Sequence, residues 1–331
     1  MAEKIKARAW MRELEIILTS TKYQKKMVFG ANWKKGKPDL NISVTGTKYL
    51  SSLKDRMTVT ITNLTYREIT ELISGQFYNI EIKAGYRKDY QTSGAHTIFK
   101  GGVLYISNVL GDRKSNDVVI LCASEMVAKY GQNRLNLSLN SGINMYSAIS
   151  FILARAGISS NKAYIDEDFK SRILKENEIA NGKVGSWLDT LCNTNNFVVN
   201  TDGILGSDVA IWSPYRRDIR KIKLTNSTII LTGGYPSLDS DGLKISLMPT
   251  FGFAPGDTIE VDNSIIDIGT RDESEALKNI AQFMDRDGNY IVYQIDINLE
   301  NRGSNFSYNL ECKAKSLWSN ILGGLGNVKW C

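Results

Sequence analysis

The stretch from Met57 to Cys122 constrains the fold more than any other part of the sequence. It opens with MTVTITNL, in which apolar residues alternate with threonines, and a period of two is typical of a strand with one buried face. Three more segments, at 77–86, 96–110 and 117–123, are rich in β-branched and aromatic residues. Gly, Asp, Asn and Ser separate them, so the pattern predicts further strands joined by turns.

A helix is predicted between the first of these strands and the next. Thr65 and Glu68 have the spacing of a capping box, in which each residue satisfies a backbone N–H of the other. Gly75 is expected to end the helix in the left-handed conformation. The predicted apolar face consists of Ile69, Leu72 and Ile73. The unit is therefore a strand, a helix and then several strands.

The same order of elements recurs near the C-terminus. The pattern predicts a strand over 258–268, a helix over 272–284 and two strands over 289–300 and 306–312. Each unit ends in a hairpin with a polar six-residue connection, GDRKSN in the first and ENRGSN in the second. Hairpins alone recur by chance in all-β proteins, but a helix between strands in both copies favours a duplicated domain.

The pattern becomes helical after residue 130. INMYSAISFILARAG has apolar residues at helical spacing with Gly157 as its stop, and GSWLDTLCNTNN predicts a second helix capped by Ser186. FVVNTDGILG and VAIWSP then indicate a hairpin that packs on helices.

The predicted fold class is mainly β with an α+β insert. Two β-barrel domains, each with a helix between strands, are joined by a small α/β domain. The predicted boundaries are 1–130 for the first barrel, 131–233 for the insert, 234–312 for the second barrel and 313–331 for a C-terminal tail. A chain of 331 residues is long enough for two independent cores.

The charge is distributed unevenly along the chain. Residues 1–50 contain 11 Lys and Arg against 4 Asp and Glu, whereas residues 251–310 contain 4 against 11. A basic and an acidic end suit docking between partners of opposite sign, and also suit two solvated faces.

The sequence gives no sign of a metal centre, a cofactor or a membrane segment. The four cysteines have no CxxC spacing and His96 is the single histidine, so we expect buried core thiols in place of zinc ligands, and Cys331 as a free terminal thiol. The N-terminus lacks an apolar signal region, which predicts synthesis in the cytoplasm.

The order of these segments resembles the baseplate or tail hub proteins of tailed bacteriophages, in particular those with contractile tails. The resemblance rests on TVTITNLT with its helix, on IKAGY, IFKGGV and FAPGDTIEV, and on the distant GNYIVYQIDINLENRGSNFSYNLEC. It implies two tail-tube-like barrels that are separated by a smaller insert.

The resemblance also implies a structural role in the virion. Such hubs form a homotrimeric ring that adapts a hexameric tail tube to a trimeric central spike, and DNA passes through the lumen. Expected partners are two further copies of the chain, the spike, the tail tube or tube-initiator protein, baseplate wedge proteins and the tape-measure protein. We expect a location in the virion tail baseplate after assembly in the host cytoplasm. An acidic second barrel would repel DNA if its carboxylates face the lumen.

The resemblance places the hairpin connections at barrel edges, where they are candidate contacts between subunits. The candidate interface residues are Asp112, Arg113, Lys114, Asn301 and Arg302. The alternative is that each lies in an ordinary solvated turn. Trp318 and Trp330 in the C-terminal tail are candidate contacts with the spike, because exposed tryptophans are common at protein interfaces.

Two other functions remain open from the sequence. The basic N-terminal part and its aromatic residues also suit a barrel that binds single-stranded nucleic acid. A spike-base protein of a contractile injection system is an alternative of the structural kind. An enzyme is not expected, because the sequence contains no nucleophile elbow, P-loop or dinucleotide glycine pattern.

Overall fold

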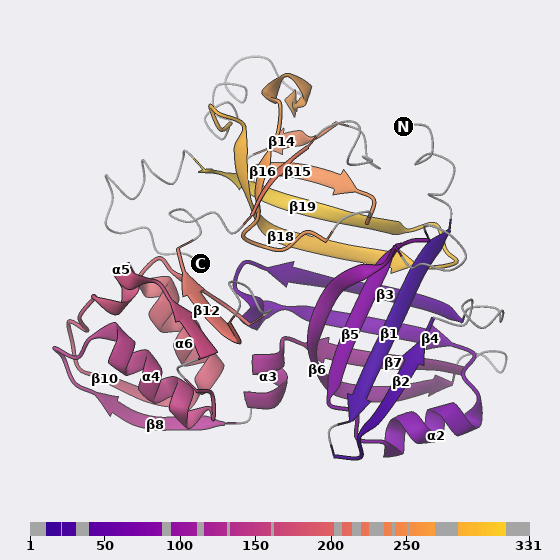
Figure 1. Ribbon diagram of the computed structural model, residues 1–331, viewed down its shortest axis with the longest axis horizontal. Coiled ribbons are helices and arrows are strands. Elements are labelled where there is room, and N and C mark those ends of the chain that lie inside the picture. The colour runs from indigo at the N-terminus through magenta and orange to yellow at the C-terminus, as the bar shows by residue number, and fades with distance from the viewer. Residues whose placement is uncertain are drawn as a thin grey trace.

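The computed structural model describes most of the chain. The described residues are 11–20, 22–30, 40–87, 94–110, 116–130, 133–159, 162–201, 207–213, 220–224, 235–239, 242–249, 252–268 and 284–315. They form two β units and a smaller α/β part, which lie at the lower right, the top and the lower left of Figure 1 respectively.

In the described residues, the first β unit contains seven strands and one α-helix. Its elements are β1 (Arg12–Ser20), β2 (Lys25–Phe29), β3 (Asn41–Tyr49), the short 3-10 helix η2 (Ser52–Lys54), β4 (Arg56–Thr62), α2 (Tyr66–Ser74), β5 (Asn79–Tyr86), β6 (His96–Leu110) and β7 (Asn116–Ala123). This is the order of strand, helix and strands that the sequence predicts for residues 57–122.

The α/β part follows and contains all the remaining described α-helices. Its elements are α3 (Glu125–Tyr130), β8 (Arg134–Leu139), α4 (Met145–Arg155), β9 (Ala163–Ile165), α5 (Glu167–Lys170), β10 (Glu178–Lys183), α6 (Val184–Thr194), β11 (Val198–Asn200) and β12 (Val209–Trp212). β11 and β12 form the expected hairpin, and β9 adds to β12 in parallel.

The second β unit contains both antiparallel and parallel strand pairs. Its elements are β13 (Lys221–Lys223), β14 (Ser237–Asp239), β15 (Gly242–Leu247), β16 (Thr258–Glu260), the 3-10 helix η5 (Asn263–Ile265), β17 (Asp267–Ile268), β18 (Asn289–Glu300) and β19 (Phe306–Ala314). The single strand predicted over 258–268 is therefore wrong. Asp262 interrupts it, because its carboxylate accepts from Ser264 N at 2.9 Å and starts η5. The helix predicted over 272–284 lies largely outside the described residues.

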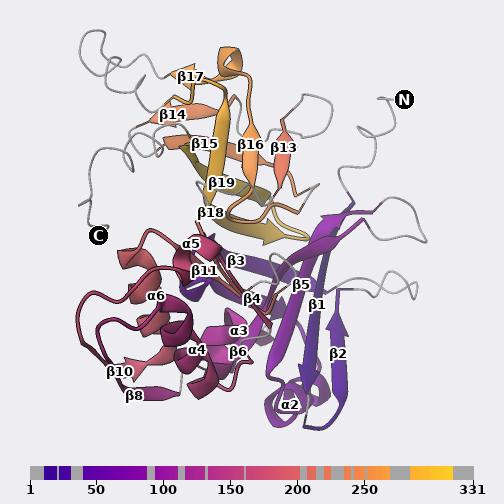
Figure 2. The same cartoon turned by 60° about the vertical axis from the view of Figure 1, so that its left-hand side comes forward.

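The two β units share one sheet. The hydrogen-bonded order runs β17-β14-β15-β19-β18-β3-β4-β7-β6-β5-β1-β2, with β16 and β13 added beside β18. The contact between the units is the pair of β3 with β18, which lie side by side in both views (Figures 1 and 2). One large apolar core contains residues from both units, among them Ile42, Val59 and Leu310. The mainly β fold is confirmed, and the two units are continuous.

The helix α2 begins as the sequence predicts and ends differently. Thr65 Oγ1 accepts from Glu68 N at 3.3 Å and the Glu68 carboxylate accepts from Thr65 N at 2.9 Å, so the capping box is present. Gly75 keeps right-handed angles with φ −75°, and the left-handed residue is Gln76 with φ 48°. Ile69 and Leu72 are buried, whereas Ile73 is 57% exposed.

The α/β part has its own apolar core. α4 and α6 contribute buried residues, including Ile149, Leu153 and Leu188, and Gly157 has the left-handed φ of 77° expected of a stop. The predicted cap of α6 is wrong: the helix already begins at Val184, so Ser186 lies in its first turn. Each fully buried Leu or Ile of such a core stabilises the fold by about 1.5–3 kcal/mol.

A small cluster fastens the α/β part to both β units. Trp212 of β12 is fully buried and packs with Leu50 and the partly buried Tyr293. Beside it, Ser51 Oγ donates to Asp189 at 2.8 Å, and Ser52 Oγ lies 3.0 Å from Thr201 Oγ1. The turn after β3 is thus held by the α/β part through apolar and polar contacts.

The described cysteines behave as expected. Cys122, Cys192 and Cys312 are free and buried, and burial raises the pKa of each thiol, for Cys122 to about 12. Cys331 lies outside the described residues. No helix in the described part is long and apolar enough to span a membrane.

Candidate assembly interfaces

β3 and β18 join the two units by backbone hydrogen bonds. They pair antiparallel without a break from Ser43 to Tyr49. Further bonds close both ends of the ladder, since Leu50 N donates to Tyr293 O at 2.8 Å and Asn301 N to Ile42 O at 3.1 Å. A strand edge of one unit is therefore covered by a strand edge of the other, which removes two exposed edges from the chain.

The hairpins β6–β7 and β18–β19 have the same register. In the first, Val103 lies opposite Cys122, and in the second, Val292 lies opposite Cys312. The register of each long strand then shifts by one residue directly after the valine. A shared bulge is a strong sign of repetition, because bulges are kept as positional features of a fold.

The strand order around these hairpins is also repeated. It is β3-β4-β7-β6-β5-β1 in the first unit and β14-β15-β19-β18-β16-β13 in the second. One difference is that β1 is antiparallel to β5 whereas β13 is parallel to β16. The element that corresponds to β18 is β6, and the one that corresponds to β3 is β14.

The edge of β6 that corresponds to the joint is open. β5 covers β6 from His96 to Gly102, and Val103 N still donates to Tyr78 O at 2.9 Å. From Tyr105 to Leu110, β6 pairs on its other side with β7, and no strand in the described parts of the chain pairs with the remaining edge. β18 carries β3 at the equivalent place.

Apolar side chains are exposed at the start of this open edge. Leu104, Tyr105 and Leu121 are 48%, 60% and 40% exposed. Leu104 occupies the bulge position that Tyr293 occupies in the second unit. There the side chain packs against Leu50 and Trp212, so the same position is covered at the internal joint and uncovered at the open edge.

Arg12 fastens the end of the β18–β19 hairpin to the first unit. Its guanidinium donates to the carbonyl oxygens of Glu300, Gly303 and Ser304 at 3.2, 2.6 and 3.3 Å. It also lies 5.2 Å from the centre of the Phe306 ring, within the range of a cation–π contact. This hairpin end is therefore bound to its own chain.

Asn301 and Arg302 are the candidate interface residues that the structure describes. The side-chain amide of Asn301 donates to Leu40 O at 2.6 Å and accepts from Ile42 N at 2.9 Å, so both of its ends bond within the chain. Arg302 is exposed. The other candidates, Asp112, Arg113, Lys114, Trp318 and Trp330, lie outside the described residues, and a contact with a neighbouring subunit stays a prediction for all of them.

The sheet face opposite the core is polar around the joint and carries hydroxyl, amide and charged groups. On β3 and β4 it presents hydroxyl groups, since Thr45 lies opposite Thr58, while Thr47 lies opposite Arg56. On β18, Asp296 accepts from Thr47 Oγ1 at 2.9 Å. The amides and hydroxyls that continue this face on β18 and β19 are Gln294, Asn298, Ser307 and Asn309.

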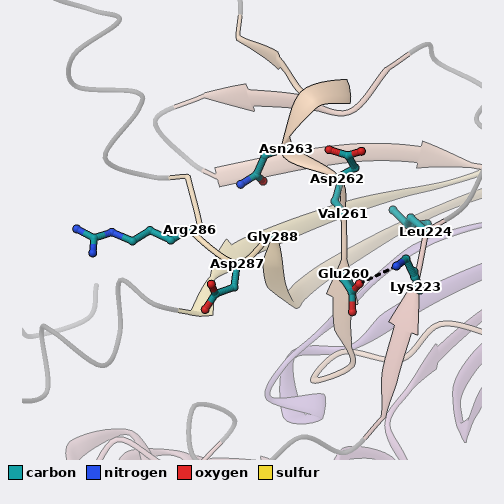
Figure 3. Close-up of a pocket in the computed structure, with 9 residues that line it drawn as sticks. All are labelled: Lys223, Leu224, Glu260, Val261, Asp262, Asn263, Arg286, Asp287 and Gly288. Carbon is teal, nitrogen blue, oxygen red and sulfur yellow. Dashed lines mark ion pairs between the residues drawn. The ribbon is translucent and has the colours of Figure 1, made fainter.

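Some carboxylates of the second unit lie on that face, and others line a pocket. Asp296 and Glu300 share the face because they pair with Thr47 and Ser43, and Glu311 shares it because it pairs with Gln294. A pocket of about 430 Å³ at the end of β13 and β16 is lined by Glu260, Asp262 and Asp287 together with Lys223 and Arg286 (Figure 3). Lys221 and Lys223 lower the pKa of Glu260, and hydrogen bonds from Ser264 lower that of Asp262. The pocket therefore has mixed charge, and an orientation of the second unit's carboxylates toward a lumen stays a prediction.

The aspartates beside this pocket form a turn. Asp285 is buried and accepts from Asp287 N at 2.9 Å and from Asn289 N at 3.0 Å. Gly288 has φ 67°, and a side chain there would come within 2.2 Å of Val261 O. Asp285 and Gly288 thus form a tight turn. Within the described ranges, no three His, Cys, Asp or Glu side chains are grouped so that they could hold a metal ion.

Sequence comparison identifies no relative: no protein-family model matches the chain, and no curated protein does. Solved structures do share its fold. The 43 kDa tail protein of prophage MuSo2 from Shewanella oneidensis superposes with a TM-score of 0.55 at 7% identity, over 92% of this chain and 97% of that one.

Two further structures have the same arrangement. A tail protein from Neisseria meningitidis gives a TM-score of 0.52 at 8% identity and covers 93% of this chain and 98% of that one. The Escherichia coli protein c3393, a type VI secretion component described as similar to the T4 tail proteins gp27 and gp5, gives 0.53 at 10% identity over 83% and 73%. The chain therefore has the fold of these phage tail and type VI secretion proteins.

Proposed function

We propose that this chain is a structural protein of a phage-type tail, and that three copies form the hub ring that adapts a sixfold tail tube to a threefold spike. The observation that carries the proposal is the internal repeat, in which two similar β units are joined edge to edge by β3 and β18. Three such chains supply six similar units while they keep threefold symmetry. A ring of this kind can face a sixfold partner on one side and a threefold partner on the other.

The joint within the chain supports ring formation because it is heterologous. Different edges meet, that of β3 on one unit and that of β18 on the other. Head-to-tail contacts of this type close into a ring when the rotation between units fits. The shared fold of the tail proteins from Shewanella oneidensis and Neisseria meningitidis supports the tail setting.

The partners follow from this role. The hub would contact the central spike on one side and the tail tube or its initiator protein on the other, with baseplate wedge proteins outside and the tape-measure protein and DNA in the lumen. The similarity of c3393 to the T4 tail proteins gp27 and gp5 supports a place in an assembly of this kind. The place of the protein would be the virion tail baseplate, after assembly in the host cytoplasm.

The proposed role is structural and includes no catalysis. We expect any wall-degrading activity of the assembly to belong to another chain. A turbidity assay with purified cell walls tests this directly, and clearing of the walls by the protein alone would contradict it.

Cryo-electron microscopy of assembled tails tests the proposed place and symmetry. We expect density for three copies in one ring, with six similar β units around the lumen, between the tube and the spike. Tails that contain one or six copies at this level, or none, would refute the proposal.

A further inference from the structure

We propose that the open edge of β6, from Tyr105 to Leu110, binds the β14 edge of a second copy of this chain. The pairing is antiparallel and has the register that β18 and β3 have within the chain. The inference rests on the proposed ring and deepens it by naming the strands that hold neighbouring copies together.

The backbone polarity of β6 fits a further strand. In β18, Tyr293 O and Asn301 N both bond β3, whereas Glu300 N bonds Asn305 O of its own hairpin. Backbone groups alternate in direction along a strand, so the backbone N–H and C=O groups of Ile295, Ile297 and Leu299 point toward β3. Their counterparts in β6, which face the open edge, are Ile106, Asn108 and Leu110.

These edge groups have no partner in the described chain. No backbone bond joins Ile106 or Asn108 to another element on that side. Unpaired N–H and C=O groups in a row are a template for another strand. The exposed Leu104 and Tyr105 lie at the same edge, so pairing there would also bury apolar surface.

The register identifies β14 as the second half of the contact. In the first unit Met57 lies opposite both Cys122 and Gly46. In the second unit Leu243 lies opposite both Cys312 and Leu238. Because Cys122 and Cys312 correspond, Leu238 takes the place of Gly46, which lies opposite Ile297 at the internal joint.

Two opposite pairs follow for neighbouring copies. Asn108 of one copy lies opposite Leu238 of the next. Ser107 lies opposite Asp239, as Asp296 lies opposite Thr47 within the chain. The internal pair is linked by a hydrogen bond of 2.9 Å, and Ser107 and Asp239 can form the same bond with donor and acceptor exchanged.

A short strand covers this edge of β14 in the single chain. β17 pairs in parallel with Ser237 and Leu238 alone, and Asp267 N donates to Pro236 O at 2.7 Å. A parallel pair of two residues is weaker than an antiparallel pair over the three residues of β14. The strand of the next copy therefore replaces β17 on this edge.

A proline placed at Asn108 tests the edge of β6. Proline removes the N–H that faces the open edge and keeps the ladder to β7, so it is tolerated at a free edge. We expect Asn108→Ala to assemble into the same multi-copy form as the wild type and Asn108→Pro to remain a single copy, by native mass spectrometry with and without the spike. Circular dichroism and thermal melting check that both variants fold.

The inference is overturned if folded Asn108→Pro assembles as Asn108→Ala does. A wild type that never assembles, with or without the spike, would refute the proposed ring together with this contact. If the wild type, Asn108→Ala and Asn108→Pro all assemble, the proposed ring stands and only the contact of β6 with β14 is refuted.

A cross-link tests the partner edge and does not depend on the proline variant. In a Cys331→Ser background, Ser107→Cys combined with Asp239→Cys should give covalent dimers and trimers on mild oxidation. Either cysteine alone is the matched control and should give no covalent trimer. If the double variant assembles but its chains do not cross-link, the assignment of β14 as the partner strand is overturned.

Discussion

Arg12 shows how a single side chain can hold the two β units in one arrangement. It lies at the start of β1 and reaches the connection between β18 and β19. Gly303 in that connection is 291 residues later in the chain. Its three acceptors are backbone carbonyls of one turn. A planar guanidinium can serve them together, and a lysine cannot.

We therefore expect Arg12→Lys and Arg12→Ala both to destabilise the protein by about 1–2 kcal/mol, since hydrogen bonds to charged groups contribute about that much. Urea unfolding measures the change. Arg67→Ala, at an exposed helix position, is the control and should change the free energy of unfolding by less than about 0.5 kcal/mol. Equal effects of all three would show that Arg12 has no special role.

Buried thiols and phenols set the alkaline limit of stability. Burial raises the pKa of Tyr86, Tyr290 and Cys122 to about 12. In the unfolded chain these groups lose their protons at about pH 8.5–10. The folded state then binds more protons than the unfolded state, so stability is full below about pH 8.5 and falls as the pH rises toward 12.

Urea unfolding at about pH 8 and pH 10.5 checks this, and we expect a lower free energy of unfolding at the higher pH. Cys122→Ala removes one of the contributing groups. Its own loss between the two pH values should therefore be smaller than that of the wild type. A wild-type free energy that does not change would contradict the account.

At the scale of single elements, local signals predicted the helix α2 and most strands. The capping box of Thr65 and Glu68 and the alternation in β4 depend on neighbours in sequence, so they can be read from it. The end of α2 could not, because Gln76 takes the left-handed conformation next to Gly75. The exposure of Ile73 depends on what packs against the helix.

The capping box gives a prediction for this element. Thr65→Ala removes the acceptor of Glu68 N, and we expect it to cost about 1 kcal/mol. Thr65→Ser keeps the oxygen and should cost less than half as much. Thermal melting compares the two variants, and equal losses would mean that the methyl group, and not the cap, stabilises the helix.

The candidate interface was only partly predictable. The sequence pointed to the hairpin connections, whereas the open edge of β6 was missed, because the hairpin pattern of 96–123 is complete without a third strand. The shared register of Cys122 and Cys312 was present in the sequence as two cysteines at the ends of similar hairpins. Which edges face each other depends on long-range pairing, such as that of β3 with β18.

At the scale of the whole molecule, one sheet continues through both units and presents a polar face of hydroxyl, amide and carboxylate groups around the joint. A surface of hydroxyl, amide and carboxylate groups offers DNA few cationic contacts, and phosphate contacts supply most nonspecific binding. We therefore expect the protein not to bind single-stranded DNA in a salt-sensitive manner. Tight, salt-sensitive binding in a fluorescence anisotropy titration would favour the nucleic-acid-binding alternative.

The central claim is that two units in one chain become six units in a ring of three. The most direct test is the mass of the full-length protein in solution, by native mass spectrometry, alone and with the candidate central spike protein. We expect three copies, either alone or on the spike. A single copy under both conditions would contradict the account.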